Sequence, residues 1–228
     1  SYGVSPYQSF SSFAGNPYFI DLDMLAAEGL LEKEEYARLD WGSEADTVDY
    51  GKLYEQRYPL LRLAVKRFLT RGSNEFEEFC EENREWLEDY TLFMTIKGMN
   101  GGASWLEWSE AERKRNPLRM EEIRTIQEEE LLFWKVVQFF FYEQWEALCA
   151  YANSNGISVI GDLPIYVALD SADIWANPQY FQLDENLMPV QVAGCPPDSF
   201  SADGQLWGNP LYRWDYHRET GYGWGLSR

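Results

Sequence analysis

The stretch GQLWGNPLY (204–212) is the most unusual candidate for chemistry in the sequence, because it sets Trp207 between two glycines. Glycine and proline interrupt it too often for a helix, and its apolar residues alternate too poorly for a strand, so we predict a loop. A loop cannot easily bury an indole. Trp207 therefore either anchors the loop to the protein or offers its flat apolar face to a ligand, and the stretch by itself leaves both interpretations open.

The second candidate for chemistry is a carboxylate, Asp162, which directly follows a short run rich in β-branched residues. Residues 157–161, ISVIG, follow a long helical pattern and a terminal glycine, Gly156. A helix, a glycine and a buried-type strand in quick succession are typical of an α/β unit with a parallel sheet. Because ligands bind at the carboxyl ends of strands in such sheets, Asp162 is a candidate for binding substrate hydroxyls or for chemistry. A turn or a helix N-cap explains an aspartate there equally well.

The charge and hydropathy of the chain exclude other classes of partner. The sequence has 38 Asp+Glu against 19 Lys+Arg, a formal net charge of −19, which leaves no basic footprint for nucleic acid or an anionic membrane. The most apolar run, LLFWKVVQFFFY (131–142), is too short to cross a bilayer and contains Lys135 and Gln138. We predict a buried helix there, and neither nucleic acid nor membrane as a partner.

The cysteines and the histidine give no sign of a metal site. Cys80, Cys149 and Cys195 are far apart in the sequence, and His217 is the single histidine. No metal-ligand spacing results, so we predict no metal and no cofactor. Reduced thiols and the absence of a secretory pattern indicate a cytoplasmic protein.

Amphipathic helices must position these segments. Apolar residues recur at three- and four-residue steps over 59–69, 74–94 and 121–155. We expect Ser73 or Asn74 to cap the second helix and the glycines at 98, 101 and 102 to end it. A further short helix is expected to begin at a capping box formed by Ser109 and Glu112. The segment FQLDENLMPVQV (181–192) predicts a hairpin that turns at residues 185–186.

Three segments together resemble one known family. They are SPYQSFSSFAGNP (5–17), GDLPIYVALDSADIWANP (161–178) and VAGCPPDSFSADGQLWGNPLYRW (192–214). In this order they closely resemble the 4-α-glucanotransferases, the amylomaltase or disproportionating-enzyme branch of the α-amylase clan, over essentially the whole chain. The resemblance implies an α/β fold, a (β/α)8 TIM barrel with inserted subdomains, of which this chain is an incomplete portion. We expect a barrel segment with a substrate-facing loop at 1–30, a helical insertion subdomain at 31–120, and a second barrel segment with active-site loops at 121–228.

The activity that the resemblance implies is transfer of α-1,4-glucan segments between maltooligosaccharides, amylose or other α-1,4-glucans by retaining double displacement. One carboxylate attacks the anomeric carbon, and a second protonates the leaving oxygen and later activates the acceptor. Transfer replaces hydrolysis where an acceptor hydroxyl is held in place and water is kept out. In typical α-amylases the segment that corresponds to DLPIYV ends in Asn-His. The ending Tyr166–Val167 resembles the transferase branch instead.

The family implies substrate-binding roles for Ser5, Tyr7, Asp162, Asp198, Gln205 and Trp207. Trp207 packs against glucan and Gln205 hydrogen-bonds its hydroxyls. Ser5 and Tyr7 line the donor pocket, with the Tyr7 ring beneath the sugar at the cleavage point. Asp162 binds donor hydroxyls and supports the nucleophile's geometry, and Asp198 belongs to a mobile loop over the active site. Tyr2 is either a contact at the rim or simple turn packing.

The chain also departs from the family. The motif of the nucleophile, similar to R-I-D-H-F-R-G, does not occur before Arg228, and the acid/base glutamate of the family comes later still. We therefore expect no catalytic residue within this chain, no activity from it alone, and weak glucan binding at most. His217 does not stand in the family's catalytic-histidine context, so we predict a surface position for it. An incomplete barrel leaves open sheet edges, which favour self-association or pairing with the missing part of the barrel.

Three alternatives stay open at this stage. The first is a related α-glucan-debranching enzyme, which would differ in motifs beyond this chain. The second is a non-catalytic glucan-binding fragment that keeps the sugar-facing loops. The third, an acidic helical interaction domain at 31–120, does not explain the three segments.

Overall fold

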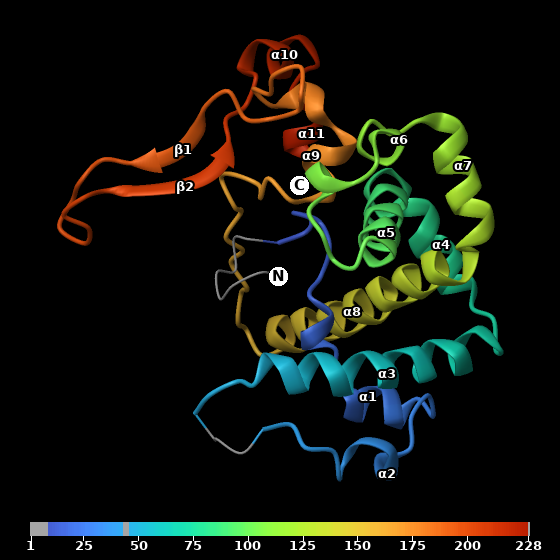
Figure 1. Ribbon diagram of the computed structural model, residues 1–228. Helices are drawn as coiled ribbons and strands as arrows, with labels where there is room; N and C mark the ends of the chain where they lie inside the picture. Colours follow the sequence, from blue (N-terminus) through green and yellow to red (C-terminus); the bar gives the residue numbers. More distant parts are fainter. Residues whose placement is uncertain (1–8, 43–45, 228) are drawn as a thin grey trace. The chain divides into compact units, whose positions relative to one another are not determined.

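The computed structural model describes residues 9–42 and 46–227, and it is mostly helical (Figure 1). The elements, in chain order, are the 3-10 helix η1 (Pro17–Phe19), α1 (Leu22–Ala27), α2 (Lys33–Tyr36), α3 (Tyr50–Leu69), α4 (Asn74–Glu82), α5 (Arg84–Met99), η2 (Trp105–Glu107), α6 (Glu110–Arg113), α7 (Pro117–Ile126), α8 (Glu128–Ser154), α9 (Ala172–Ala176), η3 (Pro178–Tyr180), β1 (Val192–Cys195), β2 (Gln205–Pro210), α10 (Trp214–Glu219) and α11 (Gly223–Leu226). Among the described residues, no helix is both long and apolar enough to cross a membrane.

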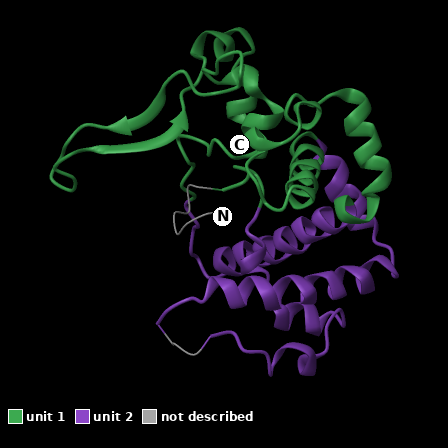
Figure 2. Cartoon of the chain, in the orientation of Figure 1, with its two compact units in different colours: residues 1–14, 85–131, 161–228 green, residues 15–84, 132–160 purple. Residues whose placement is uncertain are grey.

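Two compact units divide the chain (Figure 2). Unit 1 comprises residues 1–14, 85–131 and 161–228, and unit 2 comprises residues 15–84 and 132–160. Residues 31–120, which the sequence predicts as one helical subdomain, are shared between the two units. The predicted boundaries at residues 30 and 120 stay a prediction.

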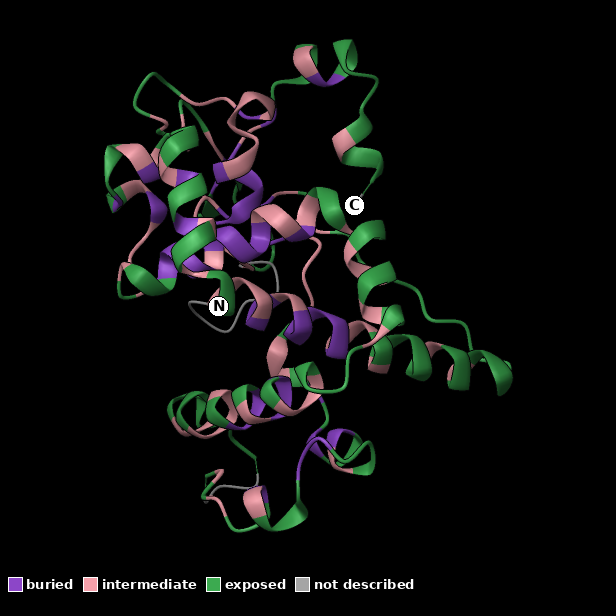
Figure 3. Cartoon of the chain, turned by 90° about the vertical axis from the view of Figure 1, so that its right-hand side faces the viewer, coloured by how far each residue is buried: buried purple, intermediate pink, exposed green. Residues whose placement is uncertain are grey.

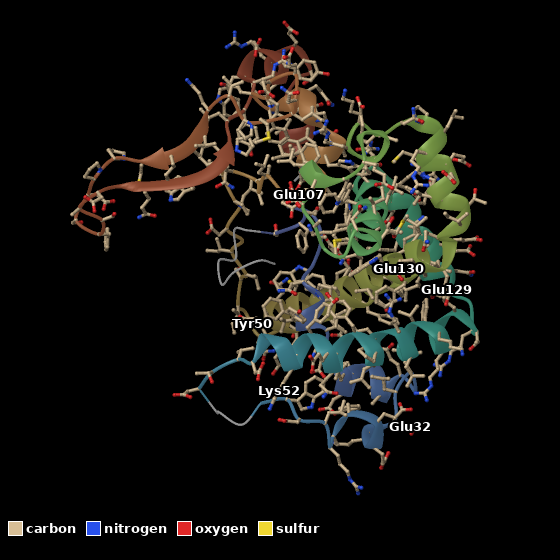
Figure 4. The ribbon with its side chains drawn as sticks, viewed as in Figure 1. Glu32, Tyr50, Lys52, Glu107, Glu129 and Glu130 are labelled. Carbon is tan, nitrogen blue, oxygen red and sulfur yellow. The ribbon has the colours of Figure 1, made fainter. Side chains whose placement is uncertain are left out.

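The helices form where the sequence predicts them, but their ends differ. The pattern over 59–69 belongs to the longer α3, which begins at Tyr50 because Asp49 accepts the N–H of Lys52 as N-cap. Figure 4 shows Tyr50 and Lys52 in the first turn of this helix. The pattern over 74–94 is divided at Asn83, whose N–H and side-chain amide both donate to the Phe79 carbonyl and so end α4.

The predicted caps are largely confirmed. Ser73 accepts the N–H of Phe76, and Ser109 accepts the N–H of Glu112. Gly98 lies within α5, so only the later glycines, at 101 and 102, follow its end. The helix predicted over 121–155 is divided at Gln127 into α7 and α8, and α8 ends with the N–H of Ile157 bonded to the Ala152 carbonyl. Its first turn carries Glu128, Glu129 and Glu130, and the positive end of the helix dipole stabilises their negative charges. Glu129 and Glu130 are labelled in Figure 4.

Unit 2 has its core between α3 and α8. Leu61, Ala64, Val136 and Val137 are fully buried there. The ring of Phe68 on α3 lies 5.6 Å from that of Phe139 and 5.3 Å from that of Phe140, both on α8. Each helix thus buries one side and exposes the other, an alternation that the colours of Figure 3 show along the ribbons.

A buried glutamine fixes the chain that precedes α1. Gln138 is 0% exposed, accepts the N–H of Gly15 at 2.8 Å and donates to the Gly15 carbonyl at 3.0 Å. A Cβ atom on Gly15 would lie 1.9 Å from Cδ1 of Phe141, so only glycine permits this approach. Gln144 makes the same pair of bonds with Asp21, at 2.6 and 3.1 Å, but in an exposed position. At both Gly15 and Asp21, a glutamine side chain of α8 therefore makes the pair of backbone hydrogen bonds that a neighbouring strand would make in a sheet.

Arginines of α3 hold the next part of the chain. Arg57 donates to the carbonyls of Pro17 and Ile20, and Arg71 donates to those of Glu28 and Gly29. Charged donors thereby bind carbonyls at the ends of η1 and α1. Arg67 adds a pair of 2.7 Å bonds to Glu35, whose neighbour Glu32 opens α2 with a capping box (Figure 4).

The carboxyl group of Glu143 is expected to make the stability of unit 2 depend on pH. The pKa of this α8 carboxyl is raised to about 7. Partial burial is the larger cause, and repulsion from the carboxylates of Glu28, Glu75 and Glu146 adds to it. The folded chain therefore holds the proton more tightly than the unfolded chain. We expect the free energy of unfolding to fall as the pH rises from about 4.5 to about 7, and to stay lower above that range.

The variant Glu143→Gln tests this dependence, because it cannot take up the negative charge. The melting temperature of the parent chain should fall more between about pH 5.5 and pH 8 than that of Glu143→Gln. Parallel curves for the two proteins would show that Glu143 does not titrate in this range.

Unit 1 has an aromatic core. The ring of Phe93 on α5 lies 5.3 Å from that of Trp108 and 5.9 Å from that of Trp175 on α9. The indole N–H of Trp175 donates to the Glu112 carbonyl at 3.0 Å. At the edge of this core Lys97, with a side chain 5% exposed, pairs with Asp170 at 2.7 Å. The packing of α5, α6 and α9 thus holds the segment that leads from Asp162 to α9.

The predicted parallel sheet is not present in the described residues. The segment 157–161 has no strand, and its apolar side chains Ile157, Val159 and Ile160 are exposed. A buried strand needs backbone partners on both sides, and the described part of the chain places none beside this segment. Two residues of the apolar stripe that the sequence predicts near the end of α8, Trp145 and Leu148, are exposed as well, as is the nearby Tyr151.

The one sheet of the described residues is an antiparallel ribbon of β1 and β2, which extends from unit 1 (Figure 1). Gly194 pairs with Leu206 and Cys195 pairs with Gln205, and the register shifts between Val192 and Gly194. The predicted hairpin at 181–192 is present in a short form, in which the N–H of Asp184 donates to the Met188 carbonyl at 2.8 Å and the N–H of Val190 donates to the Gln182 carbonyl at 2.9 Å. The N–H of Leu187 donates to the Asp184 carbonyl, and Leu183 and Pro189 form an isolated bridge.

Candidate functional site

The stretch that the sequence predicts to be a loop, 204–212, is mainly the strand β2 (Gln205–Pro210). The prediction was wrong because strand formation here depends on the partner β1 rather than on alternation. Gly204 makes the pairing possible. It has a φ of +73°, and a Cβ atom there would lie 2.5 Å from the Cys195 carbonyl oxygen. The ribbon gives Trp207 a defined orientation that a loop would not.

Trp207 and Gln205 lie two residues apart on β2, so they share one face of the strand. The indole N–H of Trp207 donates to Gln205 Oε1 at 3.0 Å, and the Trp207 side chain stays 44% exposed. An exposed indole beside an amide offers an apolar face and a hydrogen-bonding group at the same place. This combination fits a ring-shaped ligand that carries hydroxyls.

The second segment packs against the ribbon. The Asn209 side chain is buried and donates to the Val167 carbonyl at 2.8 Å. The Tyr212 hydroxyl donates to the Ile165 carbonyl, also at 2.8 Å. The second and third segments of the sequence, 161–178 and 192–214, are thereby joined within unit 1.

The first segment is attached to the same unit. Ser12 donates its N–H to Asp173 Oδ2 at 2.8 Å and its hydroxyl to Oδ1 at 3.0 Å. The N–H of Ala172 donates to the Phe10 carbonyl at 2.8 Å. Residues 9–14 of the first segment therefore lie in unit 1 with the second and third segments. Ser5, Tyr7 and Tyr2 lie outside the described residues.

The two aspartates predicted to bind substrate are both exposed. Asp162 lies in an irregular segment rather than at the end of a strand. Asp198 forms a turn, because its Oδ1 accepts the N–H groups of Phe200 at 2.9 Å and Ser201 at 2.8 Å. The structure thus gives Asp198 a local role in shaping the loop between β1 and β2, which leaves its predicted role toward substrate a prediction.

The position predicted for His217 was wrong. Its side chain is 2% exposed and its Nε2 lies 3.2 Å from the Tyr180 carbonyl oxygen. The rings of Tyr180 and Tyr212 lie 4.8 and 5.3 Å from the imidazole. Burial lowers the pKa of His217, so the ring is neutral at pH 7 and fills the core around α10.

No group of three or more metal-ligating side chains occurs in residues 9–42 and 46–227. Two buried side chains that fix backbone segments were not predicted from the sequence: Gln138, which bonds Gly15 in unit 2, and Asp173, which bonds Ser12 in unit 1. Gln138 carried a signal, since an amide in the middle of the apolar run 131–142 needs internal hydrogen-bond partners. Asp173 carried none, because an aspartate in the first turn of a helix is common.

The comparisons with known proteins agree with this geometry. The family described as 4-alpha-glucanotransferase, glycoside hydrolase family 77, matches residues 1–228, and the chain belongs to this family. The chain is 49% identical to a 4-alpha-glucanotransferase of Streptococcus pneumoniae over 230 residues, which are 100% of this chain and 46% of that protein. It is 47% identical to the 4-alpha-glucanotransferase of Thermus thermophilus, covering 45% of it.

A solved structure supports the fold. The chain matches an amylomaltase from Streptococcus agalactiae, determined in complex with acarbose, with a TM-score of 0.95 and 43% identity. The match covers 100% of this chain and 46% of the amylomaltase. The chain thus spans less than half the length of the relatives that it resembles.

Proposed function

We propose that this chain is the glucan-binding portion of a 4-α-glucanotransferase that moves α-1,4-glucan segments between maltooligosaccharides, amylose or other α-1,4-glucans. The reaction is retaining double displacement, and the carboxylates that make and break bonds lie outside these residues. The observation that supports it best is the exposed Trp207 beside Gln205 on β2, in a third segment that Asn209 and Tyr212 bond to the second segment. Membership of the family supplies the class of reaction.

The proposal extends to the whole enzyme. Its fold is a (β/α)8 TIM barrel, in which residues 157–161 become a strand once neighbouring strands are present. The exposed apolar residues near the end of α8, Trp145, Leu148 and Tyr151, then face the remaining part of the barrel, or a second copy of the chain when that part is missing. A cytoplasmic location is part of the proposal and is supported by Cys80, Cys149 and Cys195, none of which forms a disulfide.

In the proposed site Trp207 packs against a sugar ring and Gln205 hydrogen-bonds its hydroxyls. Asp162 binds hydroxyls of the donor sugar, Ser5 and Tyr7 line the donor pocket, and Asp198 shapes the loop that covers it. The absence of a bulk-water path to the covalent intermediate would favour a sugar acceptor. These residues bind and orient; none of them is the nucleophile or the acid.

Incubation with maltotriose tests the function. The full-length enzyme should convert it into a ladder of longer maltooligosaccharides with release of glucose, and the 228-residue chain should give no ladder. A ladder from the chain alone would place the catalytic carboxylates within it and contradict the proposal. If the full-length enzyme gave no ladder either, the transferase function would be wrong.

Replacing Trp207 with alanine should raise the KM of the full-length enzyme for maltotriose about tenfold, because a stacked apolar face of this kind contributes about 1.4 kcal/mol. Trp41→Phe, a change to a half-buried indole of unit 2, is the control and should leave the KM unchanged. The parameter to measure is the initial rate of glucose release against maltotriose concentration. An unchanged KM for Trp207→Ala would assign Trp207 to loop anchoring alone.

A further inference from the structure

Tyr166 is an aromatic residue of the second segment to which the proposed function assigns no role. It stands near the end of DLPIYV, is half-buried, and has two rings of the third segment as neighbours. Its centroid lies 6.4 Å from that of Trp207, with the planes at 48°, and 5.9 Å from that of Tyr212, with the planes at 13°. The Tyr166 ring is therefore stacked with Tyr212 and also lies beside the exposed indole of Trp207.

The backbone on both sides of Tyr166 is fixed. The Ile165 carbonyl accepts the hydroxyl of Tyr212, and the Val167 carbonyl accepts the buried amide of Asn209, both at 2.8 Å. Two bonds to the third segment and a stacked ring leave Tyr166 little freedom. Such preorganisation is what a binding group needs, since little conformational entropy is lost when a ligand arrives.

The Tyr166 hydroxyl makes no hydrogen bond within residues 9–42 and 46–227, and it is not sealed from solvent. Buried phenols usually find a partner inside the protein, whereas a fixed phenol that keeps its hydrogen-bonding capacity is suited to a ligand. Its neighbour, Trp207, offers the apolar face on which a sugar ring packs. An apolar platform with a polar group at its edge matches a carbohydrate, which has a C–H face and a rim of hydroxyls.

We infer that Tyr166 is a specificity-determining residue whose hydroxyl hydrogen-bonds a hydroxyl of the glucan that packs on Trp207. The inference rests on the proposed function and deepens it. It also offers a physical reason why the segment DLPIYV ends in Tyr166–Val167, since the phenol supplies a hydrogen bond to the sugar at this position. A site that hydrogen-bonds a substrate hydroxyl discriminates against ligands that lack it, because the protein group is then left unpaired.

The decisive variant is Tyr166→Phe, which keeps the ring on Tyr212 and removes only the hydroxyl. In the full-length enzyme it should raise the KM for maltotriose about three- to tenfold, as expected for one lost hydrogen bond, with less than about a twofold change in kcat. Tyr222→Phe removes the hydroxyl of another tyrosine of unit 1, 41% exposed, and should change neither parameter. A loss of stability alone would lower the amount of active enzyme and leave the KM unchanged.

Trp207→Ala separates the failure of this inference from that of the proposed function. If Trp207→Ala raises the KM and Tyr166→Phe does not, the glucan packs on the indole without the phenol, and the inference is overturned. The same conclusion follows if Tyr166→Ala is impaired while Tyr166→Phe matches the parent enzyme, because the ring then only supports Trp207. If the parent enzyme gives no ladder from maltotriose, the proposed function itself is wrong.

Discussion

Replacing Gln138 with leucine is expected to lower the free energy of unfolding by about 3 kcal/mol, because two half-buried backbone groups lose their hydrogen bonds to a buried amide at once. Gln138 is 0% exposed, and its amide satisfies both the N–H and the carbonyl of Gly15. Leucine fills a similar volume but can neither donate nor accept. Urea unfolding of the chain, followed by far-UV circular dichroism, measures the difference.

Gln144→Leu is the matched control on the same helix. Gln144 makes the equivalent pair of bonds with Asp21, but in an exposed position where water can replace the lost amide. We expect a cost below about 1 kcal/mol for this variant. Equal effects of the two substitutions would show that burial does not decide the contribution of these glutamines.

Replacing Asp170 with asparagine is expected to cost about 3 kcal/mol, because it leaves the ammonium of Lys97 buried without a carboxylate. The two side chains are 2.7 Å apart, and that of Lys97 is 5% exposed. Asp170 Oδ1 also accepts the N–H of Trp105 at 3.2 Å, so asparagine preserves the shape and part of the hydrogen bonding. Urea unfolding followed by tryptophan fluorescence reports on this aromatic core.

Two further variants give this prediction its controls. Lys114→Gln breaks a pair with Glu110 whose side chains are 51% and 73% exposed, and it should cost far less stability than Asp170→Asn. The double variant Lys97→Met, Asp170→Asn removes the stranded charge and should recover much of the loss. If Asp170→Asn cost as little as Lys114→Gln, the Lys97 ammonium would have another way to be solvated.

The sequence predicted the helical elements well where apolar periodicity and caps agree. The caps at Ser73 and Ser109 are confirmed, and the long helix before Gly156 is present. The ends were less predictable. The break at Asn83 depends on a side-chain amide that bonds back to the Phe79 carbonyl, and no periodicity signals such a bond.

The three segments of the family, and hence the family itself, were readable from the sequence because their residue order is specific over long stretches. The arrangement of the candidate site was not. Trp207 was assigned to a loop, yet it lies on β2, because the strand obtains its hydrogen bonds from β1 rather than from its own pattern. The sequence predicts a surface position for His217, yet its ring is buried against that of Tyr180, 37 residues away in the chain.

The sequence by itself determined two things about this protein: where helices can form, and the family to which the chain belongs. Both follow from the spacing and order of residues along the chain, which do not depend on contacts with remote segments. The tertiary structure alone decided which distant groups meet, such as Ser12 with Asp173, Gly15 with Gln138 and Tyr166 with Trp207. Such pairs depend on backbone hydrogen bonds and buried contacts between remote segments, and the free energy of those contacts exists only once the chain has folded.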